Sequence, residues 1–481
     1  MMRALVTALV MPLITMAPAA PDHYGLGFVA AAAGEAIATV RAGCAGCAWG
    51  ETGREAAALR VFVDGKYSQH LLLSRGESVA DYRITLGAVA PGRHRLTIDR
   101  DSSLSAIGAG RATIDVPDVS ILSRGSDDFT AQAMAPILYA RPNTIGRFTD
   151  LPLVEWYEIV STPRGRQFRY SVIFSNEDGG TATDRLMATW GRTADIEFVY
   201  GVEVGGDGRI LAEAFQGPGH EVPPFRGRHE ARHPLLWVST DNNMVSESGP
   251  TRVRYAPAPE RFDLHDVSRE VVMDANPWTY AVASLEMRRE GKIVDEAAPG
   301  NNTIPDPRRF VYVEACGQVG AAALAFAIQI GGVRLQPDQI GGVRLQLDQI
   351  GGVRLQPDQI GGVRLQPDQI SGVRLQPDRD TWIPSDRGLR QYRIVRDGCF
   401  RAAIPLPAGT HAHDVRALRV QAFERPAADG VPPAPPGPVR LTRINNVFML
   451  DELFVPGPSL LKWEGSETIR ADGPPFEVPI P

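Results

Sequence analysis

Short runs in which apolar and polar residues alternate dominate the chain, and turn residues separate them at intervals of about ten positions. In the first part of the chain, such runs lie on both sides of Asp64-Gly65, a dipeptide that favours a tight hairpin. The strands expected there are 59–63, 69–73, 82–86 and 93–98. Strands of this length and spacing are typical of a small β-sandwich, which we place at residues 22–120.

A second region rich in alternating runs begins near Asp127 and extends over residues 127–481. The strands expected there are 168–174, 196–204, 235–239, 279–287, 310–314, 322–328, 392–395, 400–404, 415–423 and 439–450. Two short helices are expected, at 183–190 before Gly191 and at 266–274 before a Pro. Because strands and helices do not alternate regularly, the predicted fold is mostly β, with an N-terminal β-sandwich and a larger β-rich domain.

Five near-identical ten-residue units of the form IGGVRLQPDQ interrupt the second domain at residues 330–379. The units differ only at Leu347, Ser371 and Arg379, and a single base change accounts for each difference. The run therefore records a tandem duplication. Two glycines and a proline in ten residues make a poor core, so we expect a loosely structured insertion at a strand connection. An ordered β-stack is the alternative.

The composition indicates a folded protein that does not bind nucleic acid. Hydrophobic residues make up 43% of the chain and charged residues 22%, which is ordinary for a globular protein. The net charge is −6, and the basic residues are dispersed rather than gathered into a patch.

The first residues have the order of a secretory signal peptide. Arg3 precedes an apolar stretch that ends near Met16, and Ala17-Pro18-Ala19 supplies small residues for cleavage. We therefore expect residues 1–20 to be a signal peptide and the mature protein to be secreted or periplasmic. No segment of the sequence has the length of about 20 apolar residues that a membrane span needs.

Four cysteines suit that location, where disulfides persist. Three pairings are open to four cysteines. We expect Cys44 to bond Cys47, because they are close in sequence, and Cys316 to bond Cys399, because they flank the repeat on strands expected to be neighbours. A redox site at Cys44 and Cys47 is the alternative, although the strand and helix of a thioredoxin-like site are missing there.

Histidines concentrate between His220 and His265, where four of the nine are found. The segment His229-Glu230-Ala231-Arg232-His233 resembles the HExxH motif of the zincin metalloproteases. The resemblance implies a helix on which His229 and His233 hold Zn²⁺ while Glu230 acts as general base. The following Pro234 disfavours that helix, and no third ligand can be assigned. A solvated polar loop is the alternative, as is another metal site that uses these imidazoles and His220.

Carboxylates gather in the segment 175–181, which contains Glu177 and Asp178, and again at Asp195 and Glu197. Hard oxygen ligands around a Gly-Gly turn suit Ca²⁺, and an acidic turn before a helix is the alternative. Asp195 and Glu197 alternate with apolar residues, so both are expected on one face of a strand. Paired carboxylates of this kind serve as acid and base in glycosidases, although such pairs also occur on solvated faces.

Aromatic and amide side chains near these carboxylates suggest contact with sugars. An Asp241-Asn242-Asn243 turn follows an expected strand, and its side chains could bind hydroxyl groups. The four tryptophans of this part of the chain could form a stacking platform or belong to the core. They are Trp156, Trp190, Trp237 and Trp278.

These observations leave two classes of function open. The first is a secreted β-rich binding or surface protein that contacts a polysaccharide or another cell-surface polymer. The second is a secreted hydrolase, metal-assisted or carboxylate-based, with its site between residues 175 and 266. Calcium and zinc are the candidate cofactors. The proposed catalytic residues are Asp195 and Glu197, and the proposed metal ligands are Glu177, Asp178, His220, His229 and His233.

Overall fold

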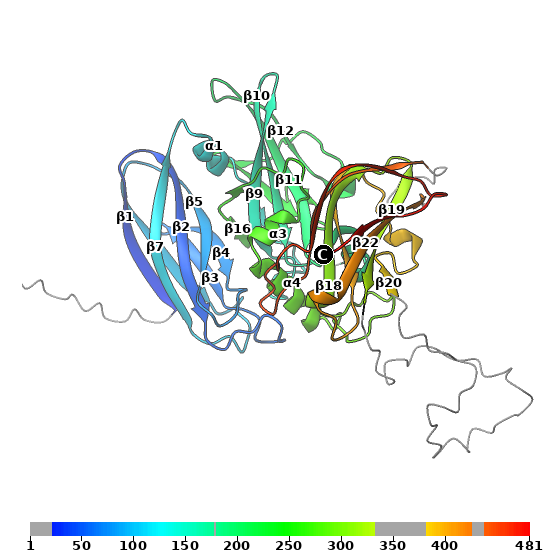
Figure 1. Ribbon diagram of the computed structural model, residues 1–481. Coiled ribbons are helices and arrows are strands. Elements are labelled where there is room, and N and C mark those ends of the chain that lie inside the picture. The colour runs from blue at the N-terminus through cyan, green and yellow to red at the C-terminus, as the bar shows by residue number, and fades with distance from the viewer. Residues whose placement is uncertain (1–21, 178, 332–380, 426–436) are drawn as a thin grey trace, which may run out of the picture. The chain divides into compact units, whose positions relative to one another are not determined.

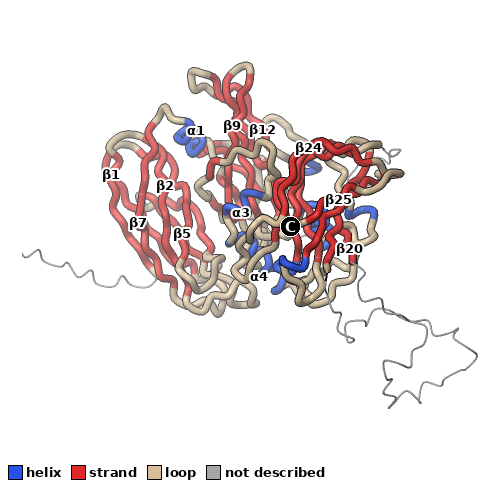
Figure 2. Tube along the Cα trace, viewed as in Figure 1, coloured by secondary structure: helices blue, strands red, loops and turns tan. Residues whose placement is uncertain are grey.

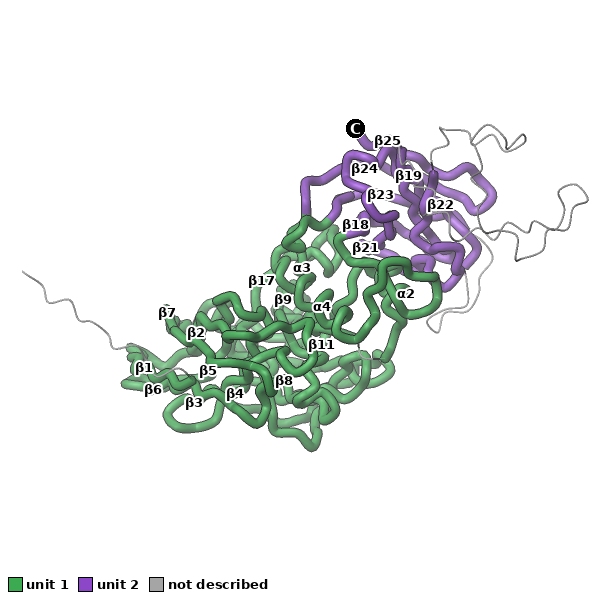
Figure 3. The backbone as a smooth tube through the Cα atoms, turned by 90° about the horizontal axis from the view of Figure 1, so that it is seen from below, with its two compact units in different colours: residues 1–308, 450–456 green, residues 309–449, 457–481 purple. Residues whose placement is uncertain are grey.

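The computed structural model describes residues 22–177, 179–331, 381–425 and 437–481 (Figure 1). Strands hold 47% of the residues and helices 11%, which confirms the mostly β class. The expected signal peptide and nearly all of the repeat lie outside the described residues. The chain forms two compact units (Figure 3), namely residues 1–308 with 450–456 and residues 309–449 with 457–481.

The first unit begins with a β-sandwich. One sheet has the order β1 (His23–Ala30), β6 (Gly92–Asp101), β3 (Ala58–Val63) and β4 (Lys66–Leu72). The other has the order β5 (Ala80–Val89), β2 (Gly34–Cys44) and β7 (Ala112–Ser123). Apolar side chains from both sheets share one core, which includes Val40, Val61 and Ile98. At the expected hairpin, Asp64 and Gly65 have φ angles of 51° and 74°, as a turn of type I′ requires.

Two further sheets contain the other described strands of the first unit, and Figure 2 colours the strands red. One has the order β12 (Ile210–Phe215), β11 (Asp195–Gly205), β10 (Gly165–Phe174), β9 (Pro152–Thr162) and β17 (Glu260–Arg261). The other has the order β13 (His229–Glu230), β14 (His233–Val238), β8 (Ile137–Tyr139) and β16 (Arg254–Tyr255), and β15 (Val245–Ser246) pairs with β14. Their common core contains Tyr170, Val202 and Leu236.

The described α-helices all lie in the first unit: α1 (Asp127–Ala133), α2 (Thr183–Trp190), α3 (Val271–Ala275) and α4 (Trp278–Arg289). The helix expected at 183–190 is confirmed, and it ends at Gly191 in the left-handed conformation, with φ 63°. The helix expected at 266–274 begins only at Val271.

The strand expected at 279–287 is wrong, because these residues belong to α4. Pro277 stands at the start of this helix, where its fixed φ fits and no backbone donor is needed. The buried residues Tyr280, Ala283 and Met287 recur at helical spacing. A second strand, expected at 392–395, is absent as well: Arg390–Tyr392 is a short 3₁₀ turn, and Ile394 makes only an isolated bridge to Leu324.

The second unit is another sandwich of two antiparallel sheets. One sheet has the order β21 (Gly398–Pro405), β18 (Phe310–Gln318), β23 (Val439–Phe448) and β24 (Leu461–Ile469). The other has the order β20 (Thr381–Pro384), β19 (Ala322–Ile330), β22 (Val415–Glu424) and β25 (Phe476–Pro479). Their facing side chains, among them Val313, Phe326 and Leu418, form one core.

The repeat joins two strands that pair directly. Ile330 is the last residue of β19, and it is aligned with Thr381, the first residue of β20. The described ends of the inserted segment therefore adjoin, and the segment connects the two strands of a hairpin.

The two disulfides are those expected from the sequence: Cys44 bonds Cys47, and Cys316 bonds Cys399. Cys316 and Cys399 are directly opposite each other on β18 and β21. Both bonds are typical of an oxidising, extracellular-type environment. Within the described ranges, we find no helix with the length and apolar character that a membrane crossing requires.

Candidate functional site

Three of the carboxylates singled out in the sequence converge at one end of the five-stranded sheet. Phe174, the last residue of β10, pairs with Asp195, the first residue of β11. Glu177 follows Phe174 by three residues, and Glu197 lies two residues after Asp195 on the same strand. The charge of Asp195 influences both glutamates, so the three groups lie within electrostatic reach of one another. We call Glu177, Asp195 and Glu197, with their partners Arg192, Gln216 and Asn243, the Asp195 cluster.

Asn243 ties the turn after β14 to Asp195. Its side-chain nitrogen donates to Asp195 Oδ2 and to the backbone carbonyl of Asn176, both over 3.0 Å. The residue is fully buried, and its φ of 54° is one that Asn adopts more readily than most residues. The Oδ1 atom of Asn243 is also buried, and no group in the described part of the chain donates to it.

Arg192 supplies the positive charge of the cluster. The left-handed Gly191 turns the chain out of α2, and Arg192 follows at once. Its Nη1 lies 3.5 Å from Asp195 Oδ1, and its Nε lies 3.2 Å from Glu270 Oε1. All three side chains are buried, so this arginine offsets charge that water cannot reach.

Glu197 has a neutral partner. Gln216, which follows β12, donates from its side-chain nitrogen to Glu197 Oε2 over 2.7 Å. The same nitrogen lies 3.3 Å from Nδ1 of His220. Among the described residues, the exposed His220 therefore meets the cluster through Gln216.

The position of Glu177 depends on a glycine. A Cβ atom at Gly180 would lie 2.2 Å from Glu177 Oε1 and 2.9 Å from the Cβ of Asn242. Any larger residue would therefore displace the carboxylate. A Cβ at the neighbouring Gly179 would lie 3.3 Å from Asp241 Oδ2. The Gly-Gly turn and the Asp241–Asn243 turn thus pack against each other, which explains the two glycines.

Burial shifts the protonation of the cluster. Burial, followed by the charge of Asp195, raises the pKa of Glu177 to about 7 and the pKa of Glu197 to about 8. Burial also raises the pKa of Asp195, although Arg192 opposes the rise. Near neutral pH, the two glutamates can therefore carry or release a proton. Carboxyl groups in this state occur often at functional sites.

The HExxH segment is a hairpin and not a helix. His229 and Glu230 form β13, Ala231 has a φ of 54°, and His233 begins β14. Glu230 is paired in register with His233. The helical arrangement that the zincin resemblance implies is therefore absent, as Pro234 suggested.

The histidines of this hairpin have separate partners. His229 Nε2 lies 2.7 Å from Glu213 Oε1. The buried His233 donates from Nδ1 to the carbonyl of Ala135, and its Nε2 lies 2.8 Å from Glu35 Oε1. Neither contact involves the Asp195 cluster.

No metal centre is evident in the residues that the structure describes, which contain no group of three or more His, Cys, Asp or Glu side chains arranged to hold an ion. Asp178 lies outside the described residues. Calcium or zinc binding by Glu177, Asp178, His220, His229 and His233 therefore stays a prediction.

The four tryptophans do not share one environment. Trp156 is fully buried, and Trp237 is buried in a small core where it stacks on Tyr139. Trp190 is half-buried. Trp278 is half-buried as well, and it lines a separate cavity.

Two members of the Asp195 cluster, Arg192 and Gln216, are not singled out by the sequence, and neither is Glu270, the second partner of Arg192. Arg192 had a local signal, because an arginine between a helix-ending glycine and an apolar strand is a candidate for burial. Gln216 and Glu270 had none, since each reaches the cluster from a distant part of the chain.

Comparison with known proteins assigns no family. No protein-family model matches the chain, and no curated protein matches it. Among solved structures, the chain is similar to a family 35 carbohydrate binding module from an environmental isolate, with 14% sequence identity and a TM-score of 0.14. The match covers 22% of this chain and 75% of the module. A likeness of this extent carries no argument about fold or ligand.

Proposed function

We propose that this protein is a secreted β-rich binding protein whose Asp195 cluster contacts the hydroxyl groups of a polysaccharide or another cell-surface polymer. One observation carries the proposal. Three carboxyl groups and two side-chain amides, from segments far apart in the sequence, meet at one end of a sheet.

The chemistry of the cluster suits a ligand rich in hydroxyl groups. A sugar hydroxyl both donates and accepts a hydrogen bond. Near neutral pH, Glu177 and Glu197 can donate when protonated and accept when ionised.

Binding can be tested with the mature protein on a panel of soluble polysaccharides by affinity electrophoresis, followed by calorimetry on any that bind. We expect Glu197→Ala and Asn243→Gly to weaken binding at least tenfold. Glu221→Gln, at an exposed glutamate nearby, serves as the matched control and should bind like the natural protein. Binding that survives both cluster variants, or binding to no member of the panel, would contradict the proposal.

A second candidate function is acid–base hydrolysis at the same carboxylates. The raised pKa values favour it, because a glycosidase needs one carboxyl group that is still protonated at working pH and a second that is ionised. In this reading, Glu197 is the acid, and Asp195, beside Arg192, is the ionised partner.

Release of reducing ends from the polysaccharides that bind separates the two functions. Loss of that release in Glu197→Gln, with binding retained, would support the hydrolase. Binding without any release supports the binding protein. Metal analysis of the purified protein tests the metal-assisted form, which requires stoichiometric calcium or zinc that disappears in Glu177→Ala.

A further inference from the structure

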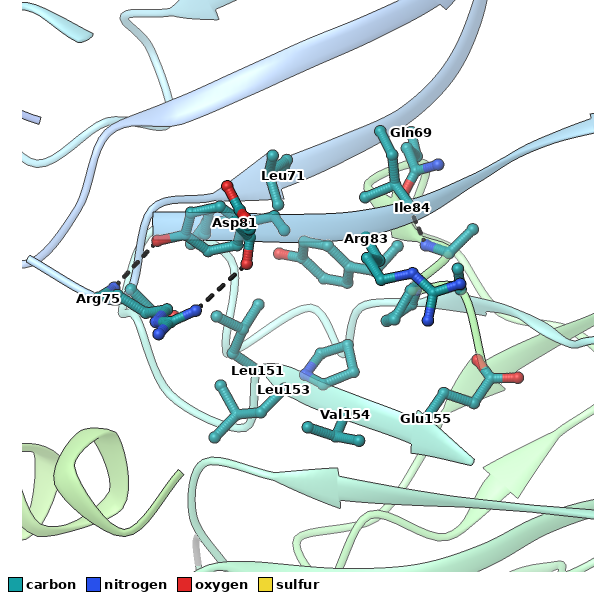
Figure 4. A pocket seen from close by; sticks show the side chains of 18 of the residues that line it. Gln69, Leu71, Arg75, Asp81, Arg83, Ile84, Leu151, Leu153, Val154 and Glu155 are labelled. Atoms are coloured by element: carbon teal, nitrogen blue, oxygen red, sulfur yellow. Dashed lines mark hydrogen bonds between the residues drawn. The ribbon is translucent and has the colours of Figure 1, made fainter. Parts of the chain in front are cut away.

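A cavity of about 230 Å³ lies in the first unit, away from the residues of the Asp195 cluster (Figure 4). Its walls come from β4, β5, the start of β9, the segment 255–260 and the start of α4. Most of the lining is apolar, and Leu71, Ile84, Leu153, Val154 and Trp278 are part of it. A dry cavity of about 150 Å³ already accommodates benzene, so this one has room for a ring with a short substituent.

Glu155 differs from the other polar residues of this lining, because it is the one whose buried side-chain oxygens lack a partner among the described residues. Its side chain is 1% exposed, and neither carboxyl oxygen has a hydrogen-bond partner in the described part of the chain. Burial raises its pKa well above the usual range, and no charged neighbour offsets that burial. Burial therefore favours the neutral, protonated form of this carboxyl group. Leaving such a group unpaired disfavours the free state, and a ligand with a matching polar group would recover that free energy.

The polar groups at the opposite end of the cavity are already partnered. Figure 4 shows Arg75 and Asp81 at one end of the lining and Glu155 at the other. Arg75 lies over the ring of Trp278 at 4.9 Å and donates to the backbone carbonyl of Asp81 over 3.2 Å. Asp81 accepts from Arg41 over 2.8 Å. Asp81 is exposed, so this end of the cavity meets solvent, and the unsatisfied group is the buried one.

We infer that this cavity binds a small uncharged molecule with an apolar body and one hydroxyl group, which exchanges hydrogen bonds with the protonated carboxyl of Glu155. The apolar walls accept the body of the ligand, and the hydroxyl meets both the donor and the acceptor of the acid. An ammonium ligand fits less well. It would require Glu155 to ionise in an apolar site, and the positive charges of Arg75 and Arg83, which both line the cavity, would repel it.

Three probes of similar shape test this inference on the full mature protein by calorimetry and saturation-transfer NMR. They are 2-phenylethanol, ethylbenzene and 2-phenylethylamine. We expect 2-phenylethanol to bind roughly fivefold or more tightly than ethylbenzene, as one buried hydrogen bond provides, and the amine to bind most weakly. Equal binding of the alcohol and the hydrocarbon, tighter binding of the amine, or no binding at millimolar concentration would each overturn the inference.

Two variants assign the preference to Glu155. Glu155→Gln keeps a donor and an acceptor and should keep the preference for the alcohol, whereas Glu155→Leu should bind the alcohol and the hydrocarbon equally. Glu286→Gln is the matched control, because Glu286 is also a buried glutamate of this unit but does not line the cavity. If Glu155→Leu does not fold, the three-probe comparison and Glu155→Gln still decide, and a Gln variant that loses the preference counts against the inference.

Discussion

The side-chain amide of Asn243 donates to the carboxylate of Asp195 over 3.0 Å, and this bond joins the turn after β14 to the first residue of β11. Both residues are almost completely buried. Burial of the Asp195 carboxylate is unfavourable even with its partners in place, and loss of a donor would leave more of that penalty uncompensated. The geometry of the cluster and the stability of the unit are therefore linked.

Replacing Asn243 tests this link. Asn243→Gly removes the amide without straining the backbone at φ 54°, and we expect it to lower the free energy of unfolding by about 1–3 kcal/mol. Asn243→Ala should cost more, because it adds the strain of a left-handed Ala. Urea denaturation followed by circular dichroism measures both. Equal stability of Asn243→Gly and the natural protein would show that Asp195 does not depend on the amide.

The raised pKa values of Glu177 and Glu197 predict a pH dependence. Each carboxyl group holds its proton more tightly in the folded protein than in the unfolded chain, where the pKa is near 4.5. The unfolded state therefore loses protons first, so stability should fall as the pH rises from about 4.5 to about 8 and level off above that.

Gln variants isolate this contribution. Glu177→Gln and Glu197→Gln should each flatten the decline in unfolding free energy, and the double variant should flatten it further. The exposed Glu221→Gln should leave the profile unchanged. An unaltered slope in the double variant would mean that both glutamates titrate normally.

His233 predicts a second pH effect with a different origin. Burial is the largest single influence and disfavours the charged form, but the hydrogen bond with Glu35, the charge of Glu35 and the bond to the Ala135 carbonyl together raise the pKa of His233. The stability from this pair is therefore fully present below about pH 6.5 and is lost as the pH rises through the folded-state value.

The pair joins β14 to β2, so its loss should be costly. His233→Ala leaves the Glu35 carboxylate buried without its partner, and we expect a loss of about 3–5 kcal/mol below pH 6.5. The double variant, His233→Ala with Glu35→Ala, should lose less unfolding free energy than the two single variants lose in sum. Thermal unfolding at pH 5.5 and 8 gives the comparison, and strict additivity would show that the two side chains do not interact.

Shortening the repeat should leave the fold intact. Deleting residues 330–369 places Ile370 where Ile330 stands, so the residue that pairs with Thr381 is unchanged in type. Loop length has a weak effect on closure entropy, and we expect a melting temperature close to that of the full chain. Loss of soluble protein on deletion would show that the units contribute to the core.

Local signals in the sequence explain which elements could be predicted. Gly191 marks the end of the helix at 183–190, and the Asp64-Gly65 dipeptide marks the turn of its hairpin. The helix at 278–289 was misread because its apolar residues also alternate over a short window. Pro277 follows the predicted helix at 266–274 as a stop signal, and it also begins the helix 278–289.

The residues of the candidate site likewise fall into two groups: those that a local sequence pattern indicates and those that only tertiary packing brings together. Asp195 and Glu197 could be placed on one face from strand alternation alone, and the acidic turn at Glu177 stood out in composition. Gln216 and Asn243 meet them only through tertiary packing, which no local pattern encodes. The cavity at Glu155 is likewise formed by tertiary packing, although a glutamate between the apolar pairs Leu153-Val154 and Trp156-Tyr157 is a visible signal in the sequence.

The pairing of Ile330 with Thr381 also has a genetic consequence. Each regular unit adds ten residues with one Arg and one Asp, so a gain or loss of units changes neither the net charge nor the residues that begin and end the hairpin. Length variants that arise by replication slippage would therefore keep the same net charge and the same flanking strand residues. We expect the number of units to differ among close relatives while the flanking strands stay the same, which would make this segment a marker of recent descent.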